Sequence, residues 1–100
     1  MRAALLCMAL AAACAPALAE THVVTIEDMK FSPAALTVQR GDTVVFRNKD
    51  MVPHTATAAG HFDSRNIAAG QSWTWKADKA GAFDYVCTYH LGMKGKVAVR

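Results

Sequence analysis

From residue 20 onward the chain is a succession of short extended segments separated by glycine, proline, asparagine and aspartate. No stretch holds a convincing helical period, and the segments instead show the composition and spacing of strands. Many short strands at this spacing predict an all-β fold, a β-sandwich. The predicted strands are residues 22–27, 36–39, 43–48, 72–77, 81–87 and 96–99, with a further short one within 55–58.

The strand predicted to end at Cys87 shows the alternation of a β-strand most clearly. Phe83, Tyr85 and Cys87 fall on one face of it, so the cysteine ends a strand whose inward face is apolar. Trp73 and Trp75 likewise share one face of their own predicted strand. We expect both indole rings to pack in the core.

The first 19 residues have the layout of a secretory signal peptide. Arg2 precedes an alanine-rich apolar run, which ends in a small-x-small pattern at residues 17–19, before the first acidic residue, Glu20. The run is too short to span a bilayer. We therefore predict that residues 1–19 are removed and that residues 20–100 form a single periplasmic domain without membrane insertion. Alternatively Cys14 is a lipidated first residue, although the alanines before it match a lipoprotein signal poorly.

The formal net charge is +3 at pH 7 with both signs scattered, so nothing suggests nucleic acid as a partner.

The cysteine content limits how this small chain can be stabilised. Cys7 and Cys14 lie in the predicted signal peptide, which leaves Cys87 without a disulfide partner. An unpaired thiol outside the cytoplasm is open to oxidation unless something occupies it, and metal ligation would protect it while stabilising the fold. The alternative is a buried, inert cysteine.

Three possible metal ligands follow one another at intervals of three residues near the C-terminus: Cys87, His90 and Met93. Such spacing lets one tight loop aim three side chains at a common point. Taken singly, a methionine is more often core filler and a histidine a surface residue. Together, after a strand that ends in the cysteine, they predict a metal site.

His54 is the fourth candidate ligand. It follows Val52-Pro53 just beyond a predicted strand, and the proline stiffens the approach to it, so a sandwich could bring it beside the cysteine loop. His61 is its rival, but lies in a glycine-flanked segment without such an approach. We expect His61 and His22 to be exposed to solvent.

This donor set selects a metal. Two imidazoles, one thiolate and one thioether suit copper, and two histidines and a cysteine with a weak axial methionine form the blue-copper electron-transfer site. Zinc is the main competitor, but a thioether is a poor zinc donor, and calcium and magnesium prefer oxygen ligands. Four protein ligands leave no open position for a substrate, which argues against an enzyme.

Residues 80–90, followed by Met93 and residues 95–97, resemble the copper loop of the cupredoxins. The two-residue gap between His90 and Met93 is similar to that of amicyanin within this family, as are residues 41–44 and 51–54. The resemblance implies a Greek-key β-sandwich that holds one type 1 copper ion. It makes His54, Cys87 and His90 the strong ligands and Met93 the weak axial one.

The sequence departs from the family pattern at two positions. Thr55 stands where cupredoxins commonly have an asparagine that braces the cysteine loop, and Tyr89 stands where amicyanin has proline. Contacts around the ligands tune rigidity and reduction potential, so these properties are less certain than ligand identity.

The resemblance also implies a function. It predicts a monomeric, non-enzymatic carrier of single electrons between redox proteins, such as a periplasmic dehydrogenase and a c-type cytochrome. The electron would pass through the exposed edge of His90, inside an apolar docking patch formed by Met51, Val52, Pro53, Leu91 and Met93. A copper-binding carrier or resistance protein with the same ligands is the main alternative, and a metal-free structural sandwich is a further one.

Overall fold

The structure is a computed structural model that describes residues 18–100. Most of the predicted signal peptide, residues 1–17, lies outside the described residues. Over residues 18–100 the regular elements are β-strands, and this part of the chain contains no helix long and apolar enough to cross a membrane.

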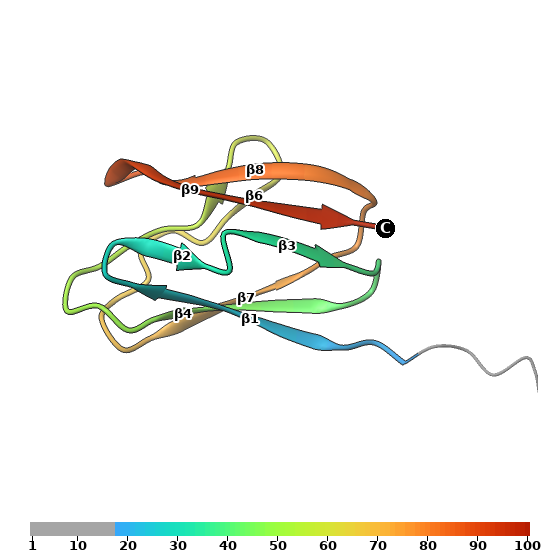
Figure 1. Cartoon of the computed structure of the whole chain (residues 1–100), viewed down its shortest axis with the longest axis horizontal. Helices are drawn as coiled ribbons and strands as arrows, with labels where there is room; N and C mark the ends of the chain where they lie inside the picture. The colour runs from blue at the N-terminus through green and yellow to red at the C-terminus, as the bar shows by residue number, and fades with distance from the viewer. Residues whose placement is uncertain (1–17) are drawn as a thin grey trace, which may run out of the picture.

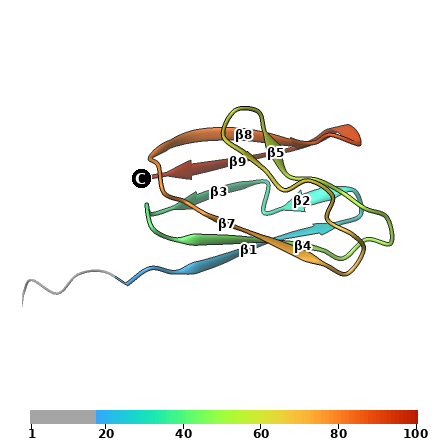
Figure 2. The ribbon, with the colours of Figure 1, turned by 180° about the vertical axis from the view of Figure 1, so that it is seen from behind.

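Two sheets lie face to face (Figures 1 and 2). The first has the order β2-β1-β4-β7 and consists of β1 (Thr21–Glu27), β2 (Lys30–Ser32), β4 (Thr43–Asn48) and β7 (Ser72–Lys76). The second has the order β3-β9-β8-β5-β6 and consists of β3 (Ala35–Val38), β5 (Thr57–Ala58), β6 (Phe62–Asp63), β8 (Gly81–Cys87) and β9 (His90–Val99). The predicted all-β sandwich is confirmed.

Alternating apolar side chains from both sheets fill the space between the layers. Phe83, Tyr85 and Cys87 are all buried, as their alternation predicts. Trp73 and Trp75 are partly buried and pack against this core, so their predicted role is confirmed. The buried apolar residues include Val24, Ile26, Phe31, Val44, Phe46, Phe62, Val97 and Val99.

Three features of the sheets differ from the sequence prediction. β2 and β6 were not predicted, because each is so short that its strand character depends on pairing with a neighbour rather than on its own pattern. β9 begins at His90 instead of residue 96, since its first residues pair back onto β8, with Cys87 opposite His90. Glycines at positions 92 and 95 interrupt the alternation that would have revealed this.

Tyr85 and Gly95 face each other across β8 and β9. A Cβ atom at position 95 would lie 2.3 Å from Cζ of Tyr85, so the tyrosine ring occupies the space that any other residue would need. The Tyr85 hydroxyl is buried without a hydrogen-bond partner among the described residues, and burial raises the pKa of this phenol. The pair therefore fixes the packing at the centre of the second sheet.

The two ends of the sandwich differ. The C-terminus and the start of β1 lie at one end, and the β8–β9 turn lies at the other, together with the loop of residues 49–53 that follows β4 (Figure 1). At the terminal end, Nε2 of His22 lies 2.9 Å from Oδ2 of Asp42 and the His22 side chain is only 20% exposed. The prediction that His22 faces solvent is wrong, because pairing of β1 with β4 brings it against this carboxylate.

At this end, hydrogen bonds to the Asp42 side chain link the start of β1 to the turn before β4. Its buried carboxylate accepts hydrogen bonds from the backbone N–H groups of Glu20 and Gln39, each at 2.9 Å. The Glu20 N–H, then the His22 side chain and the Gln39 N–H, lower the pKa of Asp42 from 3.8 to about 2. The start of β1 is thus tied to the turn that precedes β4.

Candidate metal centre

His54 and Cys87 reach one point from segments far apart in the chain. His54 follows β4 and the 49–53 loop, and its backbone forms an isolated bridge with Ile67. Cys87 is the last residue of β8, on the inward face. Both side chains are fully buried, and His54 Nδ1 lies 3.7 Å from Cys87 Sγ. The structure therefore brings these two predicted ligands together.

His90 is the first residue of β9 and Met93 is the fourth. The His90 ring is half-buried, and its centroid lies 5.4 Å from that of His54. Met93 is 5% exposed. Within residues 18–100, no three side chains of His, Cys, Asp or Glu converge as a closed metal cluster. The geometry thus consists of a converged pair, with a second imidazole beside it and the methionine buried a short distance along β9.

Asp50 orients the His54 ring from behind. Its Oδ2 lies 2.8 Å from His54 Nε2. Burial disfavours the charged form of Asp50, but hydrogen bonds from the Met29 N–H, His54 and the Asp28 N–H outweigh it and hold the pKa of this carboxyl below its usual value. A carboxylate can only accept, so Nε2 carries the proton and the lone pair of a neutral ring is at Nδ1, the nitrogen that faces Cys87.

Thr55 braces the cysteine loop. Its backbone N–H donates to Cys87 Sγ at 3.3 Å, and its Oγ1 accepts the Thr88 N–H at 2.8 Å. Threonine therefore makes the contact between loops for which the family commonly uses asparagine. At the other unusual position, the Tyr89 hydroxyl donates to Asn66 Oδ1 at 2.8 Å, which ties the β8–β9 turn to the segment after β6.

The chemistry of these donors fits a copper ion. One face of the site offers a cysteine sulfur whose buried position already has an N–H donor, as a thiolate requires, and a histidine whose free nitrogen points at that sulfur. The second imidazole and the buried thioether complete a soft donor set. His61 is exposed, as predicted, and stacks edge-on against Phe83 with a centroid distance of 4.8 Å.

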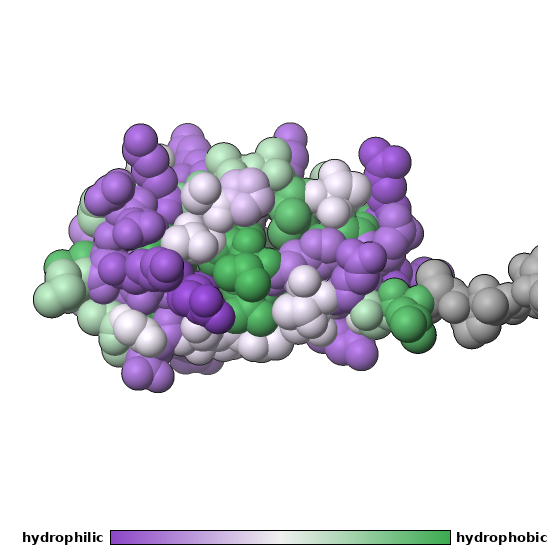
Figure 3. All heavy atoms as spheres, turned by 60° about the horizontal axis from the view of Figure 1, so that its bottom comes forward, coloured by the Kyte–Doolittle hydropathy of each residue, from purple (hydrophilic) through white to green (hydrophobic). Residues whose placement is uncertain are grey.

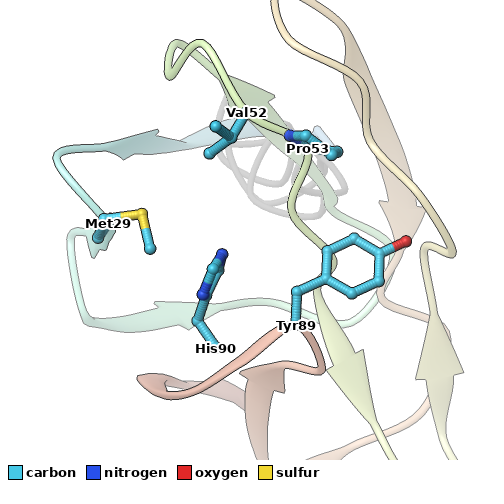
Figure 4. Close-up of a pocket in the computed structure, with 5 residues that line it drawn as sticks. All are labelled: Met29, Val52, Pro53, Tyr89 and His90. Atoms are coloured by element: carbon cyan, nitrogen blue, oxygen red, sulfur yellow. The ribbon is translucent and has the colours of Figure 1, made fainter.

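An apolar pocket of about 440 Å³ opens beside His90. Met29 from the β1–β2 turn, Val52 and Pro53 from the 49–53 loop, and Tyr89 and His90 from the β8–β9 turn surround it (Figure 4). On the face shown in Figure 3, hydrophobic surface reaches the same end of the molecule, where Figure 1 places the 49–53 loop.

The predicted docking patch needs one correction. Met51, Val52 and Leu91 are exposed as expected, with Met51 at 90%, but Met93 is buried and contributes nothing to the surface. Met93 is the third residue of the hairpin arm after His90 and falls on the inward face of β9.

Sequence reasoning missed Asp50 and Met29 as parts of this region, and it did not assign Tyr89 of the copper loop to the pocket. Asp50 lies four residues before His54, a spacing that could have suggested a partner for the imidazole. Met29 carries no such signal, because only the pairing of β1 with β2 and β4 brings it to this end.

Two packed sheets, with the His54 and His90 rings beside the Cys87 sulfur at one end, are consistent with a β-sandwich of the blue-copper class. The sequence comparison agrees with this class, since the model of the cupredoxin-like domain matches residues 1–99. The chain belongs to the cupredoxin-like family.

Individual relatives support the same assignment. Amicyanin of Paracoccus versutus is 33% identical over 87 residues, which cover 81% of this chain and 66% of that protein. The copper-resistant cuproprotein CopI of Rubrivivax gelatinosus is 33% identical over 107 residues, which cover 79% of this chain and 65% of that protein. The chain thus spans slightly under two thirds of the length of each. A solved Cu(I) structure of an amicyanin variant superposes with a TM-score of 0.74 at 32% identity, covering 80% of this chain and 82% of that one.

Proposed function

We propose that the protein is an exported, periplasmic electron carrier that holds one type 1 copper ion through His54, Cys87, His90 and Met93. Bound there, the metal would supply a Cu(II)/Cu(I) couple. The observation that carries this proposal is the buried approach of His54 Nδ1 to Cys87 Sγ at 3.7 Å, with the remaining hydrogen-bonding capacity of both groups already engaged. An imidazole nitrogen and a soft sulfur in this state are available to a metal and to little else.

The protein's own residues supply rigidity and access. Asp50 and Thr55 hold His54 and Cys87 before any metal arrives, so the donor geometry changes little between the two oxidation states. His90 is the donor that reaches the surface, beside the apolar pocket, and partner redox proteins would meet the molecule there. Four protein donors leave no position for a substrate, which supports a carrier rather than an enzyme.

A copper titration tests the metal site. Cu(II) added to the purified domain should give the intense visible absorption and the narrow paramagnetic-resonance splitting of a thiolate-copper bond, at one copper per chain. Cys87→Ala should abolish both signals while keeping the β-sheet circular dichroism. A wild-type domain that stays colourless, or a variant that keeps its colour, would contradict the proposal.

Electron exchange through the pocket has its own test. Val52→Asp places a charge at the rim of the pocket, and should slow electron exchange with a c-type cytochrome while leaving the visible spectrum intact. Val23→Asp is the matched control, because Val23 is similarly exposed, 42% against 45%, but lies on β1 outside the pocket. Equal rates for the two variants would place the exchange surface elsewhere.

The likeness to CopI favours one second candidate, a copper-binding carrier or resistance protein that uses the same donors. The two functions differ in what leaves the site. Repeated oxidation and reduction without loss of copper supports the electron carrier. Ready transfer of Cu(I) to a chelator of moderate affinity supports the copper carrier.

A further inference from the structure

The turn between β1 and β2 has a backbone conformation that Met29 does not favour. Asp28 and Met29 both have positive φ, 56° and 60°. Two such residues in a two-residue hairpin make a type I′ turn, which prefers asparagine or aspartate followed by glycine, so Asp28 suits its position and Met29 does not. Methionine has no local interaction that favours this region. Something outside the hairpin must therefore hold it.

Asp50 provides that support from the 49–53 loop. Its Oδ1 accepts the Asp28 N–H at 2.7 Å and its Oδ2 accepts the Met29 N–H at 3.0 Å. Both backbone N–H groups of the turn are thus satisfied by one carboxylate more than 20 residues away in the chain. The β1–β2 turn, held in this way, places Met29 at the wall of the pocket beside His90.

The same carboxylate contacts His54, and it is itself held in place. Oδ2 is shared between the Met29 N–H and His54 Nε2. The Asp50 N–H donates to Asn48 Oδ1 at 2.9 Å, and Asn48 Nδ2 donates to the Val52 carbonyl at 2.9 Å, which closes the 49–53 loop on a fully buried side chain. Asp50 therefore has a fixed position relative to both the imidazole and the turn.

We propose that Asp50 is a positioning residue with two roles: it fixes the ring orientation and tautomer of His54 for copper, and it holds Met29 at the rim of the electron-exchange pocket. The first role rests on the proposed function, since it matters only if His54 binds the metal. One carboxylate thereby ties the interior ligand to the surface that a redox partner meets.

The tautomer can be read without copper. In the apo-protein, long-range ¹H–¹⁵N spectra of the imidazoles should show His54 protonated at Nε2 and bare at Nδ1. In Asp50→Ala the two tautomers should mix or the Nε2 proton should exchange rapidly with water. Asp42→Ala is the matched control, because it removes a carboxylate from the other, partly buried histidine–aspartate pair and should leave the His54 signals unchanged.

The second readout is copper retention. Outer partners of metal-bound histidines typically contribute roughly 10- to 100-fold to affinity, so Asp50→Ala should release copper to a chelator faster by about that factor. Asp50→Asn keeps one acceptor oxygen, so its copper release rate should lie between those of Asp50→Ala and the wild type. It also provides the test if Asp50→Ala fails to fold. Hydrogen exchange at the Met29 amide should accelerate in both variants and remain slow in Asp42→Ala.

The outcomes separate the two proposals. A wild-type His54 tautomer, Met29 exchange rate and copper release rate in both Asp50 variants would overturn the role of Asp50. If the wild type binds no copper but Asp50→Ala still alters the His54 tautomer and Met29 exchange, the positioning holds and the proposed function fails.

Discussion

The two ends of the sandwich each contain a histidine paired with an aspartate at almost the same distance. His54 and Asp50 lie 2.8 Å apart, and His22 and Asp42 lie 2.9 Å apart. The difference is in what surrounds each pair. The second nitrogen of fully buried His54 faces a cysteine sulfur, whereas Asp42 uses its remaining capacity to accept backbone N–H groups at the start of β1 and in the following turn. The Asp50–His54 pair thus orients the proposed copper ligand, whereas the His22–Asp42 pair anchors the start of β1.

The largest difference between the two pairs should appear in copper binding. His54→Ala should weaken copper affinity by more than about 100-fold, because it removes a ligand rather than a partner of one. His22→Ala should leave affinity within about twofold, since His22 lies at the opposite end. Competition titration against a copper chelator measures both, and similar losses in the two variants would break the distinction.

The packing between the two ends provides the next test. Gly95→Ala would drive a methyl group into the Tyr85 ring and should cost about 2 kcal/mol or more of unfolding free energy. Gly92→Ala is the matched control, because a Cβ at that position of β9 meets nothing within 4 Å. Denaturant titration of the copper-free protein compares them; equal stabilities would mean that the second sheet can shift around Tyr85.

Acid should act mainly on the anchoring pair. The pKa of Asp42 is lowered to about 2 by the Glu20 N–H, the His22 side chain and the Gln39 N–H, against 3.8 in an unfolded chain. The stability that this carboxylate contributes is therefore complete above about pH 4 and is lost as the pH falls towards 2. Between pH 4 and 2, the melting temperature of the apo-protein should fall more steeply than that of Asp42→Asn. Parallel curves would assign the acid sensitivity to other carboxylates.

The smallest effect is expected at the unpartnered hydroxyl of Tyr85. Tyr85→Phe removes a buried polar group that has no hydrogen bond in the described part of the chain, so unfolding free energy should stay within about 1 kcal/mol of wild type or rise. The hydrogen bonds of the His54–Asp50 and His22–Asp42 pairs should be unchanged in this variant. A large loss in a denaturant titration would reveal a partner for that hydroxyl.

Much of the fold follows from local patterns. Alternation predicts β1, β4, β7 and β8 closely, since each of these strands has one face in the core. The short strands β2 and β6 escape prediction because they are too short to show a pattern of their own, and the first half of β9 escapes it because a register shift falls between Val86 and Cys87.

The candidate site divides in a similar way. The residue types and spacing of Cys87, His90 and Met93 could be recognised because all three lie on one short segment. Asp50 was missed despite its spacing of four residues from His54, since an aspartate in a polar loop is usual for a turn, and its contacts with the Asp28 and Met29 amides exist only once β1, β2 and β4 have assembled.

The hydrogen bond from the Glu20 nitrogen to Asp42 bears on export. Processing at the predicted site after Ala19 would turn this amide into an α-ammonium group, placed 2.9 Å from an ionised carboxylate. A neutral donor would become a charged one, and charge-assisted hydrogen bonds are roughly twice as strong as neutral ones. Removal of the leader would thus itself strengthen the attachment of the new chain start, and the processed form should melt at a higher temperature than the precursor.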